Sequence, residues 1–224
     1  MNLTAIVVFF GIPFVIGLVA QHRVRSTFAR NLQVPIANGL TGAEVARRVL
    51  DANGLHDVPV EEVQGSLSDH YDPRNRSVHL SSDVYSNRSI ASTAVGAHEV
   101  GHAIQHANAY GFFRFRSAIF PVFAFSQNLV PMFLLGGIIL QVTGFIYVAV
   151  ALFSVAVLFQ FVTLPVELDA SRRAKRQLQD LGLVAANESA GVSSVLTAAA
   201  WTYVAGALAA IAQLLYWLSV VSNR

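Results

Sequence analysis

The chain has 224 residues, of which 54% are hydrophobic and only 12% are charged, and its formal net charge is +2. Charged residues make up about a quarter of a typical soluble domain, so this composition predicts an integral membrane protein with a small soluble part. The small net charge gives no reason to expect a nucleic-acid partner. Because the chain has no cysteine, a disulfide framework and cysteine-ligated zinc are both excluded.

The first long apolar segment covers residues 1–20 and contains no charged side chain. About 20 apolar residues suffice to cross a bilayer. A cleaved signal peptide is the alternative, but it needs a positively charged region before the apolar run, and none is present. The positive charges follow the segment, at Arg23, Arg25 and Arg30. The positive-inside rule therefore predicts an uncleaved first span with its N-terminus outside and residue 21 onward in the cytoplasm.

Residues 21–117 form the predicted cytoplasmic domain, which mixes helix and strand patterns. Thr41 and Glu44 have the spacing of a capping box, and an apolar helical face follows them. Strands are expected at residues 58–63 and 77–81, and residues 67–74 are expected to form a polar turn between them.

Pro59 favours a sheet edge for the first of these strands, because proline cannot donate to a neighbouring strand. An edge strand beside a catalytic helix can bind an extended peptide by β-augmentation. Ordinary structural packing explains the two strands equally well.

The most informative motif is His98-Glu99-Val100-Gly101-His102, which has the form H-E-x-x-H. Ser89 as N-cap predicts a helix over residues 90–107. His98 and His102 then lie on one helical face and can bind one metal ion. Glu99 lies about 100° around the helix, where it can accept a proton from a water that the ion activates. Two imidazoles and an open position favour zinc.

A catalytic zinc site usually has three protein ligands, so a third is needed. His106 lies eight residues after His98, or about 12 Å along the helix axis at ~1.5 Å per residue. One ion cannot easily contact both, so His106 is expected to be a supporting or surface residue. Glu167 is the stronger candidate, for a reason of topology.

Residues 118–166 contain no charge and are long enough for two spans, expected near 118–139 and 144–165. Such a hairpin returns the chain to the side that it left. Glu167 therefore emerges on the cytoplasmic side at the start of a new helix, near the H-E-x-x-H helix. The alternative is a solvated carboxylate that the helix dipole favours.

The last two segments are a cytoplasmic helix over residues 167–192 and a fourth span over residues 193–224 that ends outside. This topology places every acidic residue in the cytoplasm, together with every lysine and arginine except Arg224. The predicted fold is an α-helical membrane protein with about four spans and a small cytoplasmic α+β domain.

Several motifs closely resemble those of the YugP-like family of bacterial membrane zinc metallopeptidases. They occupy residues 20–28, 39–46, 69–73, 97–106 and 164–171, and so extend along most of the chain. The resemblance implies a multi-pass protein of the bacterial plasma membrane with a zincin-like domain on the cytoplasmic side. It further implies a gluzincin-type peptidase with one zinc ion, held by His98, His102 and Glu167.

The chain is more distantly similar to membrane peptidases of the HtpX type, which carry E-x-x-x-D after the histidine motif. There the aspartate supports a zinc-bound histidine. In this chain the position four after Glu167 is Ser171, so that support differs. Asp169, two residues after Glu167, is the nearest replacement, and both residues are candidates for supporting a histidine ligand.

The expected reaction is hydrolysis of a peptide bond, with Glu99 as the general base. An additional donor must stabilise the oxyanion that forms, and His70 or Tyr71 is the candidate. The alternative for both is a structural role in the turn.

Two other functions fit the motif. An intramembrane protease of the site-2 type would carry H-E-x-x-H inside an apolar span, whereas residues 89–109 contain many polar side chains. A membrane scaffold or adaptor with a structural zinc would need a fourth protein ligand. The expected partners are a peptide or protein substrate, the lipid bilayer, and a regulatory membrane protein or a second copy of the chain.

Overall fold

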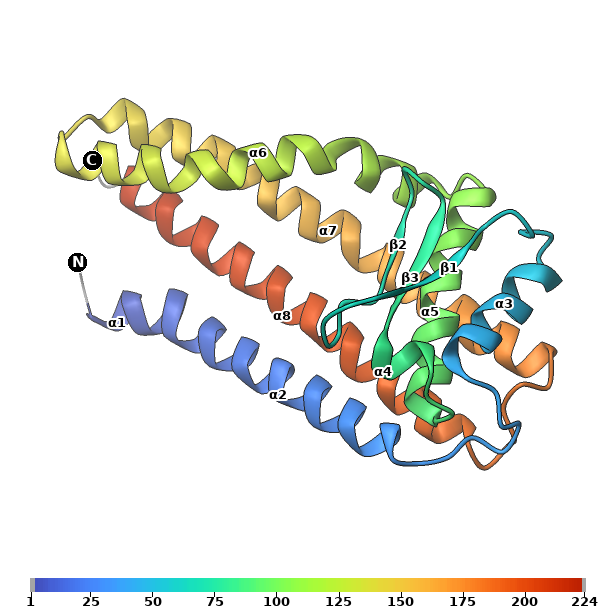
Figure 1. Cartoon of the computed structure of the whole chain (residues 1–224). Helices are drawn as coiled ribbons and strands as arrows, with labels where there is room; N and C mark the ends of the chain where they lie inside the picture. Colours follow the sequence, from blue (N-terminus) through green and yellow to red (C-terminus); the bar gives the residue numbers. More distant parts are fainter. Residues whose placement is uncertain (1–2, 223–224) are drawn as a thin grey trace. The chain divides into compact units, whose positions relative to one another are not determined.

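A computed structural model describes residues 3–222 and consists mainly of helices with one small sheet (Figure 1). Arg224 and the first two residues, for which the sequence predicts an outer location, lie outside this range. The helices are α1 (Leu3–Ile6), the π-helix η1 (Val7–Gly11), α2 (Ile12–Leu32), α3 (Gly42–Ala52), α4 (Ser82–Tyr85), α5 (Ile90–Ala107), α6 (Gly111–Ile139), α7 (Thr143–Asp180) and α8 (Ser189–Ser222). The strands are β1 (Val60–Val63), β2 (His70–Asp72) and β3 (Ser77–Ser81).

The chain divides into two compact units. The apolar unit contains the described residues of Met1–Gln21, Arg114–Leu164 and Trp201–Arg224, and the mixed unit contains His22–Phe113 and Pro165–Ala200. Four helices, α2, α6, α7 and α8, pass from one unit into the other along the sequence. All acidic residues belong to the mixed unit.

Four helical segments among the described residues are long and apolar enough to cross a membrane, as the sequence predicts. They are Leu3–Leu32, Gly111–Ile139, Thr143–Asp180 and Ser189–Ser222. The predicted hairpin turn is also confirmed, since α6 ends at Ile139 and α7 begins at Thr143. Gln141 has a positive φ of 55° in this turn. Gly137 stays inside α6, where an added Cβ would lie 2.7 Å from the Ile146 side chain.

The helix expected over residues 167–192 differs from the structure at both ends. It does not begin anew near Glu167, because α7 continues through Pro165 from Thr143 to Asp180, and α8 begins at Ser189. Proline removes one helical hydrogen bond and normally disfavours continuation. Beyond it, however, an apolar stripe at four-residue spacing is fully buried, so packing outweighs the local loss. The stripe consists of Val166, Ala170, Ala174 and Leu178.

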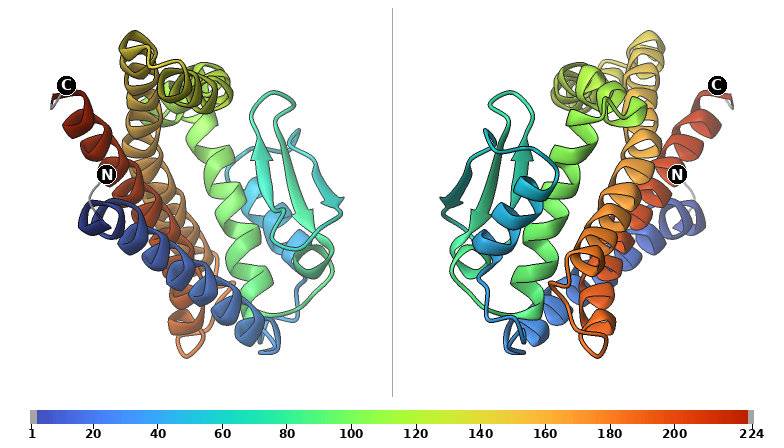
Figure 2. Two further views of the ribbon diagram at one scale, coloured as in Figure 1. Left: turned by 90° about the vertical axis from the view of Figure 1, so that its left-hand side faces the viewer. Right: turned by 90° about the vertical axis from the view of Figure 1, so that its right-hand side faces the viewer.

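The mixed unit is built around α5, which contacts α3 and the sheet. Figure 2 shows the three strands side by side with α3 and α5 on one side of them. The strand order is β1-β3-β2, with β1 parallel and β2 antiparallel to β3. β1 is therefore at an edge, as Pro59 predicts. Val78 and Leu80 of β3 are fully buried in the core that the helices share.

Both predicted helix caps are confirmed. Thr41 and Glu44 form a reciprocal capping box at the start of α3, and the Ser89 side chain accepts a hydrogen bond from the Ser92 backbone at the start of α5. The two helices cross closely because Gly96 faces the backbone of Gly42, where a Cβ would lie 2.7 Å from the Gly42 carbonyl oxygen. The position and direction of α5 are therefore fixed at its first turns.

The expected polar turn at residues 67–74 is also corrected, because its central part forms strand β2. The Asp69 carboxylate accepts hydrogen bonds from the Ser81 backbone N–H at 2.8 Å and from the Ser81 hydroxyl at 3.0 Å. Asp72 accepts from the Arg74 backbone and side chain, and the guanidinium lowers the pKa of Asp72 to about 2. These contacts hold the two ends of β2, which pattern analysis of so short a polar segment does not reveal.

We expect Asp69→Ala to lower the free energy of unfolding in detergent by about 1–3 kcal/mol, because the fully buried Ser81 loses its acceptor. Asp69→Asn is the matched control, since an amide oxygen still accepts from Ser81. Burial raises the pKa of Asp69. The folded state therefore binds a proton more readily than the unfolded state, and wild type should gain stability relative to Asp69→Asn as the pH falls through this raised pKa. Equal stability of all three proteins across pH 4–8 would contradict this account.

Candidate metal centre

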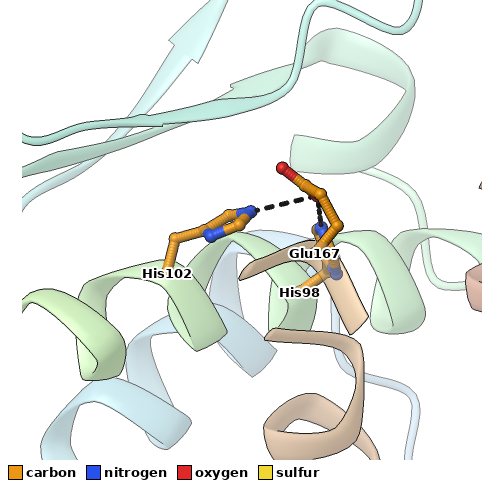
Figure 3. Close-up of side chains that lie close together, drawn as sticks. All are labelled: His98, His102 and Glu167. Carbon is orange, nitrogen blue, oxygen red and sulfur yellow. Dashed lines mark hydrogen bonds and ion pairs between the residues drawn. The ribbon is translucent and has the colours of Figure 1, made fainter. Parts of the chain in front are cut away.

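The two histidines of H-E-x-x-H and Glu167 lie together in the mixed unit (Figure 3). The Nε2 atom of His98 is 3.2 Å from Oε2 of Glu167, and the Nε2 atom of His102 is 3.5 Å from the same oxygen. Within residues 3–222, this is the group of three or more potential ligands whose atoms all lie within 4.8 Å of one another. The structure therefore brings together the three residues that the sequence predicts as ligands.

The spacing of these atoms fits a zinc ion. Zinc–nitrogen and zinc–oxygen bonds of about 2.0–2.1 Å at tetrahedral angles separate two ligand atoms by roughly 3.3 Å. The two observed separations, 3.2 and 3.5 Å, lie on either side of this value. The donor set of two imidazoles and one carboxylate is also one that zinc prefers in catalytic sites.

The site is largely removed from solvent. Glu167 is 2% exposed and His102 is 7% exposed. A buried carboxylate carries a large desolvation cost unless a cation or hydrogen-bond donors face it. In this pocket the imidazoles face it, and an ion between them would satisfy all three groups.

Glu99 lies on the same helix, one residue after His98, and is 7% exposed. The helix geometry turns residue 99 by about 100° from His98, so Glu99 does not share the helical face of the two histidines. Glu99 is not part of the three-residue cluster, and its role as general base stays a prediction.

Glu167 reaches the histidines because α5 and α7 approach closely at Gly101. A Cβ added to Gly101 would lie 2.6 Å from the carbonyl oxygen of Ala170. A side chain at this position would therefore push apart the two helices that carry the three candidate ligands. Gly101 is one of the two variable positions of H-E-x-x-H, and its small size at this contact explains why glycine suits it.

The two proposed supporting residues both lie behind the histidines. The Ser171 hydroxyl is 3.2 Å from Nδ1 of His98, on the opposite side of the ring from Glu167. Asp169 does not contact a histidine directly. It accepts a hydrogen bond from the amide of Gln105 at 2.9 Å, and Gln105 in turn lies 3.0 Å from Nδ1 of His102.

His70 and Tyr71 point to opposite faces of the sheet, as neighbours in a strand do. The exposed His70 ring stacks on His79 at 4.7 Å, and its Nδ1 donates to the Ser68 carbonyl. The structure therefore does not bring His70 to the cluster, and its catalytic role stays a prediction. Tyr71 faces the core, and its hydroxyl is 2.9 Å from Nδ1 of His106.

Tyr71 is a neutral phenol at physiological pH. Burial raises the pKa of Tyr71 to about 12 and lowers the pKa of His106. The phenol and His106 Nδ1 share one hydrogen bond, whose direction depends on the tautomer of the imidazole. His106 supports Tyr71 and is not part of the three-residue cluster, as the helix spacing predicts. Phe113 packs against the rings of Tyr71, His102 and His106, and joins them into one aromatic cluster.

Sequence reasoning did not identify Gln105 or the close contact at Gly101. Both have a weak signal in the sequence. Gln105 is a polar residue three positions after His102 on a helix that is otherwise apolar there, and such spacing places two side chains side by side. Ala97 and Gly101 form a small-residue pair four positions apart, which is typical of a helix that packs closely against another.

Comparisons with known proteins agree with this site. Residues 6–222 match the family described as "Putative neutral zinc metallopeptidase". The chain is 49% identical over 204 residues to "Putative membrane protease YugP" of Bacillus subtilis (strain 168), and the match covers 91% of each protein. No solved structure matches the chain.

Proposed function

The chain belongs to the neutral zinc metallopeptidase family, and we propose that it is a membrane-embedded zinc metalloendopeptidase of the gluzincin type. In this proposal His98, His102 and Glu167 hold one zinc ion, and Glu99 is the general base. The substrate is a peptide or protein, and the site faces the cytoplasm at the membrane surface. The observation that carries the proposal is the buried cluster of His98, His102 and Glu167 beside Glu99.

A zinc ion at this site would act as a Lewis acid and lower the pKa of a water molecule toward neutrality. Glu99 would accept the proton of that water and then deliver it to the amine of the leaving peptide fragment. Glu167 and the two histidines take no part in this proton transfer.

Tyr71 is the better placed of the two candidates for oxyanion stabilisation. Its phenol is neutral at physiological pH, and its O–H can donate to a developing negative charge when His106 Nδ1–H donates to the phenol oxygen. It faces the same side of the sheet as α5, and Phe113 connects its ring to that of His102. His70 lacks this placement, because its ring stacks on His79.

The number of candidate ligands favours a catalytic rather than a structural ion. A structural zinc usually has four protein ligands and no open position. Among the described residues, the cluster supplies three. His106, the remaining histidine of α5 on this face, is hydrogen-bonded to Tyr71. This distribution supports a peptidase over a zinc-containing scaffold or adaptor.

The division of the chain supports a site at the membrane surface. In the described part of the chain, α5 is not among the four helices that are apolar enough to span a bilayer. The mixed unit, which contains the site, holds every acidic residue and most lysines and arginines. The positive-inside rule then places this unit in the cytoplasm.

The orientation can be measured directly because the chain has no cysteine. We expect a single cysteine at the exposed position Glu62 to resist an impermeant maleimide in intact cells and to react after the cells are opened. A cysteine in the turn at Gln141 is the matched control, and the predicted topology places it outside. Labelling of the Glu62 position in intact cells would reject the cytoplasmic location.

We expect purified wild-type protein to bind one zinc ion and to cleave an unstructured substrate such as casein. Glu99→Gln should retain zinc and lose about 10²- to 10⁴-fold in cleavage rate, because only the base is removed. Glu167→Ala should lose both zinc and cleavage. Bound zinc is measured by elemental analysis of detergent-purified protein, and cleavage is followed on the same samples.

Glu62→Gln is the control, because this exposed carboxylate on β1 is outside the cluster. Full activity of Glu99→Gln would remove Glu99 as the base. Zinc bound by wild type with no cleavage of casein or of a peptide library would favour the scaffold.

We expect Tyr71→Phe to retain zinc and to lower kcat by about 10- to 10³-fold with a smaller effect on KM, because the lost hydrogen bond acts in the transition state. His70→Phe removes the other candidate and should leave kcat close to that of wild type. The steady-state kinetics of the two variants decide between the residues. A loss in His70→Phe without one in Tyr71→Phe would reverse the assignment.

A further inference from the structure

Gln105 is a buried polar residue of α5 that the proposed reaction does not use. Its side chain is fully buried, and all its polar atoms have partners. The amide nitrogen donates to the Val166 carbonyl at 2.7 Å and to the Asp169 carboxylate at 2.9 Å. The amide oxygen faces Nδ1 of His102 at 3.0 Å.

These contacts determine which way the amide points. Val166 O and the Asp169 carboxylate are both acceptors, so the group that faces them must be the NH₂ donor. A flipped amide would place its oxygen against two other oxygens in a site without water access. The Gln105 oxygen therefore faces His102, and it can only accept a hydrogen bond from that ring.

The orientation of the amide in turn sets the tautomer of His102. Because Gln105 offers an acceptor, Nδ1 of His102 must carry the hydrogen. The neutral ring then has its lone pair on Nε2, which is the atom that faces Glu167 at 3.5 Å. Arg173 donates to Asp169 at 2.5 Å and holds the carboxylate that orients the amide.

The same amide contacts the segment that delivers the third ligand. Val166, whose carbonyl accepts from Gln105, directly precedes Glu167 in α7. Gln105 thus connects His102, a candidate ligand on α5, with the α7 backbone next to Glu167.

We propose that Gln105 is a positioning residue that keeps His102 in its Nε2 metal-binding tautomer and fixes α7 beside Glu167. This inference rests on the proposed zinc site. The chemistry requires an acceptor at the end of the side chain that faces His102 and a donor at the end that faces α7. A residue that only fills space would not need either.

The test compares Gln105→Leu with Gln105→Glu. Leucine has a similar volume and removes all three hydrogen bonds. Glutamate keeps an acceptor toward His102 and, when protonated on its other oxygen, one of the two donors toward α7. A packing role predicts that glutamate is at least as harmful as leucine, because it buries a second carboxyl next to Asp169.

The positioning role predicts the opposite order. We expect Gln105→Leu to lower zinc affinity by about 10- to 100-fold and Gln105→Glu to stay within about threefold of wild type. Affinity is measured by competition with a chelator, and the visible absorption of the cobalt-substituted protein reports the ligand geometry independently of activity. Gln177→Leu is the matched control, since Gln177 accepts from Asn53 between α3 and α7 away from the cluster.

The outcomes are distinct. Zinc affinity and a cobalt spectrum like those of wild type in a folded Gln105→Leu protein would overturn the inference and leave the zinc site intact. A tenfold or larger loss in Gln105→Glu would also overturn it. If Gln105→Leu does not fold, Gln105→Glu alone decides by the same limits. Absence of zinc from the wild-type protein would instead reject the proposed function.

Discussion

The close contact between α5 and α7 at Gly101 is the constraint on which the candidate site depends. The two histidines lie on α5, and the carboxylate that completes the set lies on α7. A Cβ at Gly101 would lie 2.6 Å from the Ala170 carbonyl oxygen, so the backbones touch at this point. Glu167 lies one helical turn before Ala170, which places its short side chain within reach of both rings. With a larger residue at Gly101, the same ligands would be present but too far apart.

Because the cluster is buried, the close contact between α5 and α7 also determines which partners the Glu167 carboxylate can have. A carboxylate that is 2% exposed is unfavourable unless positive charge or donors surround it. Hydrophobic packing of α5 and α7 therefore stabilises the fold while it brings a carboxylate and two imidazoles together. A metal ion would resolve this conflict, because it would replace water as the partner of the carboxylate and both imidazoles. Ser171 and Gln105 then fix the outer ring nitrogens, which restricts each histidine to one useful orientation.

Features that depend on neighbouring residues could be predicted from the sequence. The caps of α3 and α5, the helix that carries H-E-x-x-H and the four long apolar segments follow from local patterns. Glu167 could be predicted as the third ligand only by following the chain through its uncharged hairpin, since no fixed spacing connects it to His102.

Features that depend on distant contacts could not be predicted. Strand β2 exists because Asp69 binds Ser81 twelve residues later, and α7 continues through Pro165 because residues beyond it are buried. Gln105 looks like any buried glutamine until its partners on α7 are known. The sequence thus supplied the chemical groups and the topology, whereas the interactions that orient those groups required the structure.

The order of the candidate ligands along the chain determines when the cluster can form during synthesis. His98 and His102 precede the uncharged segment of residues 118–166, and Glu167 follows it directly on the same helix as its second half. During synthesis the two histidines are therefore complete long before the carboxylate exists. The cluster can close only after both apolar segments have been made. A chain that stops within the hairpin contains His98, Glu99 and His102 but lacks Glu167. Completion of the apolar hairpin is thus a condition for forming the cluster, and a fragment that ends before it cannot hold all three candidate ligands.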